Sequence, residues 1–119
     1  MGDRLDSYRA LGASPSRLTA DNGVFDSFGE LYPRAYAPGA IGSRVKEFIA
    51  LAISVVKDCD DCITYHAIQL HEDGSSWDEI HETLALVLVV GGSALIPTIR
   101  RTAAFWSELD ADLRRTPDA

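Results

Sequence analysis

Two cysteines and a histidine lie close together in this 119-residue chain: Cys59, Cys62 and His66. Residues three or four apart lie on one face of a helix, so on a helix these side chains would be neighbours. At a helix start, free backbone amides and the positive end of the helix dipole favour a thiolate over a thiol. An adjacent imidazole can take up and return the thiol proton. The pattern therefore predicts a dithiol redox site with a nucleophile, a second thiol and a base.

Glu47 is a carboxylate within a mostly apolar segment. Residues 44–56 and 59–72 are expected to form two helices joined by a short turn. In an antiparallel hairpin, Glu47 would lie roughly 15 Å from the turn and His66 roughly 10 Å from it. A carboxylate near that level would orient the imidazole and raise its basicity, as in a catalytic triad. The structural alternative for Glu47 is an ion pair with Arg44 or a solvent-exposed place in the first turn.

Other sites use the same residue types. The two cysteines and His66 supply three zinc ligands, whereas a closed structural site needs four, so His71, His81 or a carboxylate would have to complete it. A c-type haem needs a histidine directly after the second cysteine, where Ile63 stands. Two buried thiols beside a core histidine form the purely structural alternative.

The order and spacing of the four residues resemble the core motif of the AhpD-like alkylhydroperoxidases, within the carboxymuconolactone decarboxylase superfamily: a glutamate, eleven residues, a cysteine, two residues, a cysteine, three residues and a histidine. The stretch from Trp77 to Gly92 also resembles the next helix and glycine break of that family. The resemblance covers about residues 38–106. It implies an all-α fold of about six helices, with the cysteine pair at a helix N-terminus, and an obligate homo-oligomer.

The resemblance also implies roles for the four residues. Cys62 would be the attacking thiol, Cys59 would close the disulfide, and Glu47 and His66 would relay the proton. Helix-end electrostatics alone favour Cys59 as the exposed nucleophile, so the order of the two thiols stays open. The catalytic residues predicted from the sequence are therefore these four, with no bound cofactor and no metal.

Asp61 departs from the family pattern, because some active peroxidases have a histidine immediately before the second cysteine. Asp58 and Asp60 add two more carboxylates to the same turn. Anions beside a thiol raise its pKa and oppose the effect of the helix dipole. We therefore expect this acidic turn to slow peroxide chemistry more than dithiol chemistry as such.

Length and composition point to one domain over residues 1–119, with loosely matched helices in 1–37, a core in 38–106 and a tail in 114–119. A net charge of −7 without a basic stripe argues against nucleic acid. The apolar run Leu84–Val90 is too short to span a bilayer, and the N-terminus has no apolar signal core. These features predict a cytoplasmic protein, in which paired cysteines are catalytic or metal-binding.

The segments around the site give further expectations. We expect a short helix or a fraying arm over 3–11, a helix start at Ser14-Pro15 and a loop over Pro33–Gly42. We also expect an N-cap at Ser43 for the 44–56 helix, a capping box that begins at Ser76, and an N-cap at Ser93 for the last helix. The 44–56 helix is apolar almost all round, which predicts burial on most sides. The run 84–90 predicts burial against another subunit. Phe25 and Phe28 are expected in the core or at a subunit contact, with a hydrophobic pocket wall for a substrate as the alternative, and His71, Glu72 and His81 are expected at the surface.

The function predicted on these grounds is a thiol-dependent oxidoreductase that reduces hydroperoxides through a dithiol/disulfide cycle. Its expected partners are further copies of the chain, as a trimer or hexamer, and a dithiol reductant of the lipoyl or thioredoxin-like type. One alternative is a decarboxylase of the carboxymuconolactone type, although those enzymes do not depend on a cysteine pair. The other is a metal-binding or structural oligomer without catalysis.

Overall fold

The computed structural model describes residues 3–13 and 23–112, and in these ranges it contains helices and no strand. The elements are α1 (Asp3–Ala13), α3 (Gly23–Tyr36), α4 (Ser43–Val56), α5 (Asp60–Glu72), α6 (Trp77–Gly91), the 3-10 helix η1 (Ser93–Leu95) and α7 (Ile96–Ala111). The all-α class and the count of about six helices are therefore confirmed for the described part of the chain. The expected helix start at Ser14-Pro15 and the tail 114–119 lie outside the described residues.

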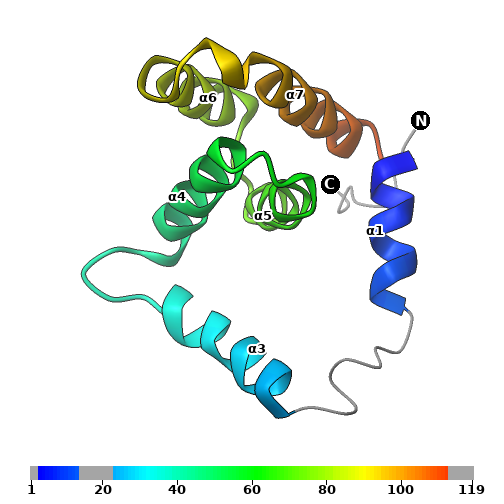
Figure 1. Cartoon of the computed structure of the whole chain (residues 1–119), viewed down its shortest axis with the longest axis vertical. Coiled ribbons are helices and arrows are strands. Elements are labelled where there is room, and N and C mark those ends of the chain that lie inside the picture. The colour runs from blue at the N-terminus through cyan, green and yellow to red at the C-terminus, as the bar shows by residue number, and fades with distance from the viewer. Residues whose placement is uncertain (1–2, 14–22, 113–119) are drawn as a thin grey trace.

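α5 lies at the centre of the arrangement, and Figure 1 shows it nearly end-on between α4 and α1, with α6 and α7 on a third side. It packs most extensively against α4, to which the turn 57–59 joins it, and also against α7 and α1. α3 stands apart from this group beyond the loop 37–42, and its main neighbour is α4. The two helices that carry the candidate site residues therefore form the central hairpin.

The core is built from apolar side chains of α5 and of the helices around it. Its buried members are Leu5, Leu51, Val55, Ile63, Ala67, Ile68, Leu70, Ile80, Leu84, Val87, Phe105, Trp106 and Leu109. Burying one large apolar side chain contributes about 1.5–3 kcal/mol, so this cluster holds α1, α4 and α7 against α5 and holds α6 against α4 and α7.

The turn between α4 and α5 is a Schellman motif. The N–H of Asp58 donates to the carbonyl of Val55 at 3.0 Å, and the N–H of Cys59 donates to the carbonyl of Ser54 at 3.1 Å. α5 ends with the same pair of bonds around Gly74, which has a φ of 85°. Asp58 occupies the equivalent left-handed position with a φ of 54°, although it has a side chain. That conformation costs about 1–2 kcal/mol relative to glycine, so something else must favour an aspartate there.

The sequence predicted serine caps at three helix starts, of which the structure confirms one. The capping box at Ser76 is confirmed, because its hydroxyl accepts from the N–H of Glu79 and the glutamate side chain accepts from the N–H of Ser76. Ser43 does not cap α4, since its hydroxyl donates to the carbonyl of Tyr36 at 2.6 Å. Ser93 lies in η1 and makes no side-chain cap to the last helix, which begins after it.

The predicted loop over Pro33–Gly42 is too long at its start. α3 continues through Pro33 and ends at Tyr36, so the connecting loop is 37–42. A proline in the last turn removes one main-chain hydrogen bond and leaves the earlier turns intact. The extension matters because it brings the aromatic side chains at the end of α3 toward α5.

The prediction that the 44–56 helix is buried on most sides is wrong for the single chain. Its buried residues are Glu47, Leu51, Ser54 and Val55, which form one stripe toward α5. On the other side, Ile53 and Val56 join Leu86 and Val90 of α6 around an apolar groove of about 300 Å³. We call these four residues the α4–α6 face; each is more than half exposed. α3 has no buried residue, so its aromatic side chains are not part of the core.

Candidate active site

Glu47 and His66 form a buried pair in the centre of the α4–α5 hairpin. Oε1 of Glu47 lies 2.8 Å from Nδ1 of His66, and both residues are buried. Each side chain supplies the partner that the other requires in an apolar environment. Arg44, the alternative partner, instead contacts Ser75 and Glu79. With the Nδ1 proton donated to the carboxylate, Nε2 of His66 remains as the acceptor that can take a proton.

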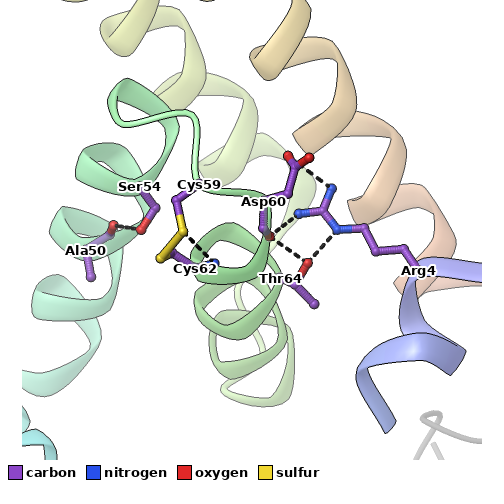
Figure 2. Close-up of a disulfide and its surroundings, with 7 residues drawn as sticks. All are labelled: Arg4, Ala50, Ser54, Cys59, Asp60, Cys62 and Thr64. Atoms are coloured by element: carbon purple, nitrogen blue, oxygen red, sulfur yellow. Dashed lines mark hydrogen bonds and ion pairs between the residues drawn. A yellow bond between two sulfur atoms is a disulfide. The ribbon is translucent and has the colours of Figure 1, made fainter. Parts of the chain in front are cut away.

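Cys59 and Cys62 stand at the start of α5 and are joined as a disulfide, with their Cα atoms 5.3 Å apart. Cys59 is the N-cap residue, and its sulfur accepts a hydrogen bond from the N–H of Cys62 at 3.2 Å. The expected position of the pair at a helix N-terminus is confirmed. In Figure 2 the disulfide lies on the side of α5 that faces Ser54 of α4. The free amides of this helix start are therefore available to a sulfur anion when the bond is reduced.

A cavity of about 530 Å³ opens beside the disulfide. Its lining includes Cys62 and His66 from the predicted set, whereas Cys59 and Glu47 lie outside it. The remaining lining residues are Gly29, Tyr32, Pro33, Asp61 and Tyr65. A molecule in this cavity would meet the sulfur of Cys62 and the imidazole before it met the other two side chains.

Three tyrosines surround the imidazole. Ring centroids of Tyr65 and Tyr36 lie 5.1 Å and 6.0 Å from that of His66, and Tyr32 stacks on Tyr36. Burial, and then the nearby Glu47 carboxylate, raise the pKa of Tyr36 to about 12. The same two causes raise the pKa of Tyr65. Both phenols therefore stay protonated near neutral pH, and they add aromatic surface without adding negative charge.

The sequence analysis did not identify these tyrosines. Tyr65 directly precedes His66, so a local signal was present in the motif itself. Tyr32 directly precedes Pro33, and Tyr36 is part of α3 only because the helix extends across that proline, where the sequence predicted a loop. No local signal points to them.

Two of the three aspartates around the cysteines are paired with arginines. Arg101 of α7 contacts Asp58 at 2.6 Å and Asp60 at 3.4 Å. Arg4 of α1 donates to the backbone carbonyl of Asp60 and lies 3.9 Å from its carboxylate. The expectation of an unbalanced acidic turn therefore needs correction for these two residues. Asp61 remains at the cavity wall beside Cys62.

The histidines proposed as further zinc ligands lie elsewhere. Nε2 of His71 lies 2.8 Å from Oδ1 of Asp110, and its ring packs on Trp106. The expectation that His71 faces solvent is wrong, because these contacts cover most of its surface. His81 is exposed and stacks on Trp77. Within residues 3–13 and 23–112, no three His, Cys, Asp or Glu side chains are grouped to hold a metal ion.

Fold and site together define a helical domain with a cysteine pair at a helix start and a buried carboxylate–imidazole pair behind it. The chain belongs to the carboxymuconolactone decarboxylase family, whose model matches residues 23–105. The resemblance noted from the motif is thereby confirmed, and the match extends over α3 as well as the helices that follow it. No helix in the described segments is long and apolar enough to cross a membrane.

Solved structures of similar fold include proteins from Thermotoga maritima and Legionella pneumophila. Two crystal structures from Thermotoga maritima match with TM-scores of 0.77 and 0.70, at 35% and 40% sequence identity. The first match covers 92% of this chain and 95% of the other, and the second covers 75% and 92%. A carboxymuconolactone decarboxylase family protein from Legionella pneumophila matches with a TM-score of 0.68 at 25% identity, over 88% of this chain and 86% of its own.

Two relatives of known sequence are uncharacterised proteins. One, from Cupriavidus necator, is 29% identical over 107 residues, which cover 81% of this chain and 95% of the relative. The other, encoded in the cox locus of Paracoccus denitrificans, is 26% identical over 102 residues, which cover 86% and 92%. This chain therefore spans almost the full length of both relatives.

Proposed function

We propose that this protein is a thiol-dependent oxidoreductase that reduces organic hydroperoxides through a Cys59–Cys62 dithiol/disulfide cycle. The observation that carries the proposal is the buried Glu47–His66 pair, whose imidazole shares a cavity wall with the sulfur of Cys62. A nucleophile, an oriented base and a second thiol within about two helix turns are what thiol-based peroxide reduction needs.

In the proposed first step, Nε2 of His66 accepts the Cys62 proton and the thiolate attacks the distal oxygen of the hydroperoxide. An S–O bond forms, the O–O bond breaks, and the departing alkoxide takes a proton and leaves as an alcohol. Cys62 becomes a sulfenic acid. Glu47 keeps the imidazole oriented and stabilises its charged form while it holds the proton.

In the second step, the Cys59 sulfur attacks the sulfur of Cys62. The S–S bond forms, the S–O bond breaks, and the hydroxide leaves as water after it gains a proton. The sum is one hydroperoxide and two thiols converted to one alcohol, one water and one disulfide. Cys62 is proposed as the attacking thiol because it lines the cavity, whereas the sulfur of Cys59 is engaged with the N–H of Cys62.

A dithiol then restores the reduced enzyme by thiol–disulfide exchange. We propose a lipoyl-type dithiol or a thioredoxin-like protein as this reductant, which fits a cytoplasmic location. The resemblance to AhpD-like enzymes supports both choices. The Thermotoga maritima relative, described as a candidate for involvement in the antioxidative response, supports the same class of function.

The cavity favours uncharged hydroperoxides with an apolar or aromatic body. Tyr32, Tyr65 and Pro33 offer ring surface, while the Asp61 carboxylate repels anions from the wall beside the sulfur. Hydrogen peroxide would leave most of the 530 Å³ unfilled and would gain little from this lining.

Self-association into a trimer or hexamer is part of the proposal. The α4–α6 face and the apolar side chains of α3 give the single chain large exposed apolar areas. Such areas are unusual on a monomer and are typical of subunit contacts.

The cycle has a direct test in thiol counting and cysteine variants. Cumene hydroperoxide should consume two thiols per reduced chain and leave an intrachain disulfide. Cys62→Ser should abolish peroxide-dependent turnover, and Cys59→Ser should accumulate a sulfenic acid that dimedone traps on Cys62. Full turnover in both variants would refute the mechanism. Decarboxylation of a lactone acid that survives both substitutions would favour the alternative enzyme class.

A further inference from the structure

The turn that carries Cys59 is held from two sides by arginines far away in the sequence. Arg101 of α7 contacts the carboxylates of Asp58 and Asp60. Arg4 of α1 donates to Thr64 and to the backbone carbonyl of Asp60. Figure 2 shows Arg4 reaching Asp60 from the side of α5 opposite Ser54. The first and last described helices thus meet at the start of α5.

Asp58 is an unusual residue at its position. Its φ of 54° belongs to the left-handed region, where glycine is the residue without strain, as Gly74 is at the end of α5. The aspartate side chain offers a reason, since it accepts from the hydroxyl of Thr98 at 2.7 Å and from Arg101 at 2.6 Å. Backbone strain at a residue next to a reactive group is typical of a position with a functional role.

The charges of this cluster lie on the residues next to Cys59, whose sulfur is bonded to that of Cys62. Two carboxylates flank Cys59 in sequence, and without partners they would disfavour a thiolate. Arg101 contacts both of them, so it offsets negative charge on either side of the cysteine. Ionisable groups from several elements lie around the turn. The turn and its neighbours contribute Lys57 and Asp58 of the turn, Asp60 and Asp61 of α5, Arg4 of α1, and Arg101 of α7. The surroundings of the imidazole contribute Tyr32 and Tyr36 of α3, Glu47 of α4, and Tyr65 and His66 of α5.

We propose that Arg101 is a positioning residue that sets the acidity of the Cys62 thiol by neutralising Asp58 and Asp60 and holding their turn against α7. It acts through the two aspartates and does not itself contact the reacting sulfur. The inference deepens the proposed function, because it assigns control of the same dithiol to a residue outside the cavity. Arg4 supports the turn mainly through the backbone of Asp60 and is the lesser contributor.

The test compares Arg101→Gln, Asp58→Asn and the double variant in the reduced full-length protein. Asparagine tolerates the left-handed conformation and keeps an oxygen for Thr98, so Asp58→Asn removes charge with little change of backbone. Arg100→Gln is the matched control, because Arg100 is an exposed neighbour outside the cluster. The readout is the pH dependence of Cys62 alkylation by iodoacetamide, an uncharged reagent, followed by peptide mass spectrometry.

Arg101→Gln should raise the Cys62 pKa by about half a pH unit, below the one to three units that a charge in direct contact produces. Alkylation at a pH below both pKa values then slows about threefold, and the double variant returns toward the parent rate. Arg100→Gln should match the parent. Identical pH profiles of alkylation for Arg101→Gln and the parent would overturn the proposal. So would a double variant whose Cys62 is alkylated no faster than that of Arg101→Gln.

Alkylation needs no peroxide, so this test is independent of turnover. A shifted profile in a protein without peroxidase activity would retain the role of Arg101 and reject the proposed function. An unshifted profile in a protein with peroxidase activity would reject the role of Arg101 and retain the proposed function. Thermal unfolding followed by circular dichroism verifies that each variant is folded before its profile is measured.

Discussion

Glu47 and His66 show how a charged residue is kept inside a small helical domain. Glu47 lies on the buried stripe of α4, where an unpaired carboxylate would cost several kcal/mol. Its contact with Nδ1 of His66 offsets that cost, and it leaves Nε2 as the ring nitrogen without this partner. The same hydrogen bond stabilises the fold and, in the proposed mechanism, orients the imidazole that accepts the thiol proton.

Glu47→Gln should raise the pKa of the reactive thiol by about one unit, because the neutral amide stabilises an imidazolium–thiolate pair less well than a carboxylate. The pH profile of iodoacetamide alkylation measures this shift. Near neutral pH the rate should fall about tenfold if the thiol pKa lies above that pH. Glu82→Gln, which changes an exposed glutamate of α6, serves as the control. A profile unchanged by Glu47→Gln would remove this residue from the proton relay.

Much of the residue-level geometry followed from local spacing. The cysteines and His66 belong to one helix, so their shared face was predictable from separations of three and four. Glu47 was predictable because a three-residue turn leaves α4 and α5 little choice except to pack as a hairpin. The arginines were not predictable, since Arg4 lies 60 residues from Thr64 and no periodicity links segments so distant.

At the scale of helices, the C-terminal end of α4 and the N-terminal end of α5 determine where the cysteines lie. The Schellman turn after α4 makes Cys59 both the last residue of one motif and the N-cap of the next helix. Caps were predictable where a side chain and the backbone N–H that donates to it lie three residues apart, as at Ser76. They were not predictable where a tertiary contact competes, as at Ser43, whose hydroxyl donates to Tyr36 instead.

Ser76→Ala should destabilise the protein by about 1 kcal/mol, because it removes the acceptor for the N–H of Glu79 at the start of α6. Urea unfolding followed by circular dichroism measures the change in the free energy of unfolding. Ser93→Ala is the matched control, since Ser93 makes no side-chain cap and the change should stay within about 0.5 kcal/mol. Equal effects of the two substitutions would show that the capping box contributes nothing specific.

At the scale of the molecule, the single chain covers only one side of its central hairpin. α5 and α7 pack against the inner side of α4, while the α4–α6 face remains open and almost entirely apolar. The sequence predicted that the apolar runs of these helices need burial, and it could not predict which part would be buried within one chain. Which apolar residues are buried within one chain depends on how the helices pack. An apolar pattern that covers the whole circumference of a helix does not determine that packing.

Val90→Asp should separate the assembly without unfolding the chain. Val90 is 79% exposed in the single chain, so a charge there is well solvated when no second subunit covers it. Buried unpaired in a subunit contact, the same carboxylate would cost at least about 3 kcal/mol, which is roughly a hundredfold or more in the dissociation constant. Sedimentation velocity should show a trimer or hexamer for the parent and smaller species for the variant. Ser107→Asp, which adds the same charge at an exposed position of α7, should leave the assembly intact. A parent that sediments as a monomer, or a variant that assembles like the parent, would show that the α4–α6 face is not a subunit contact.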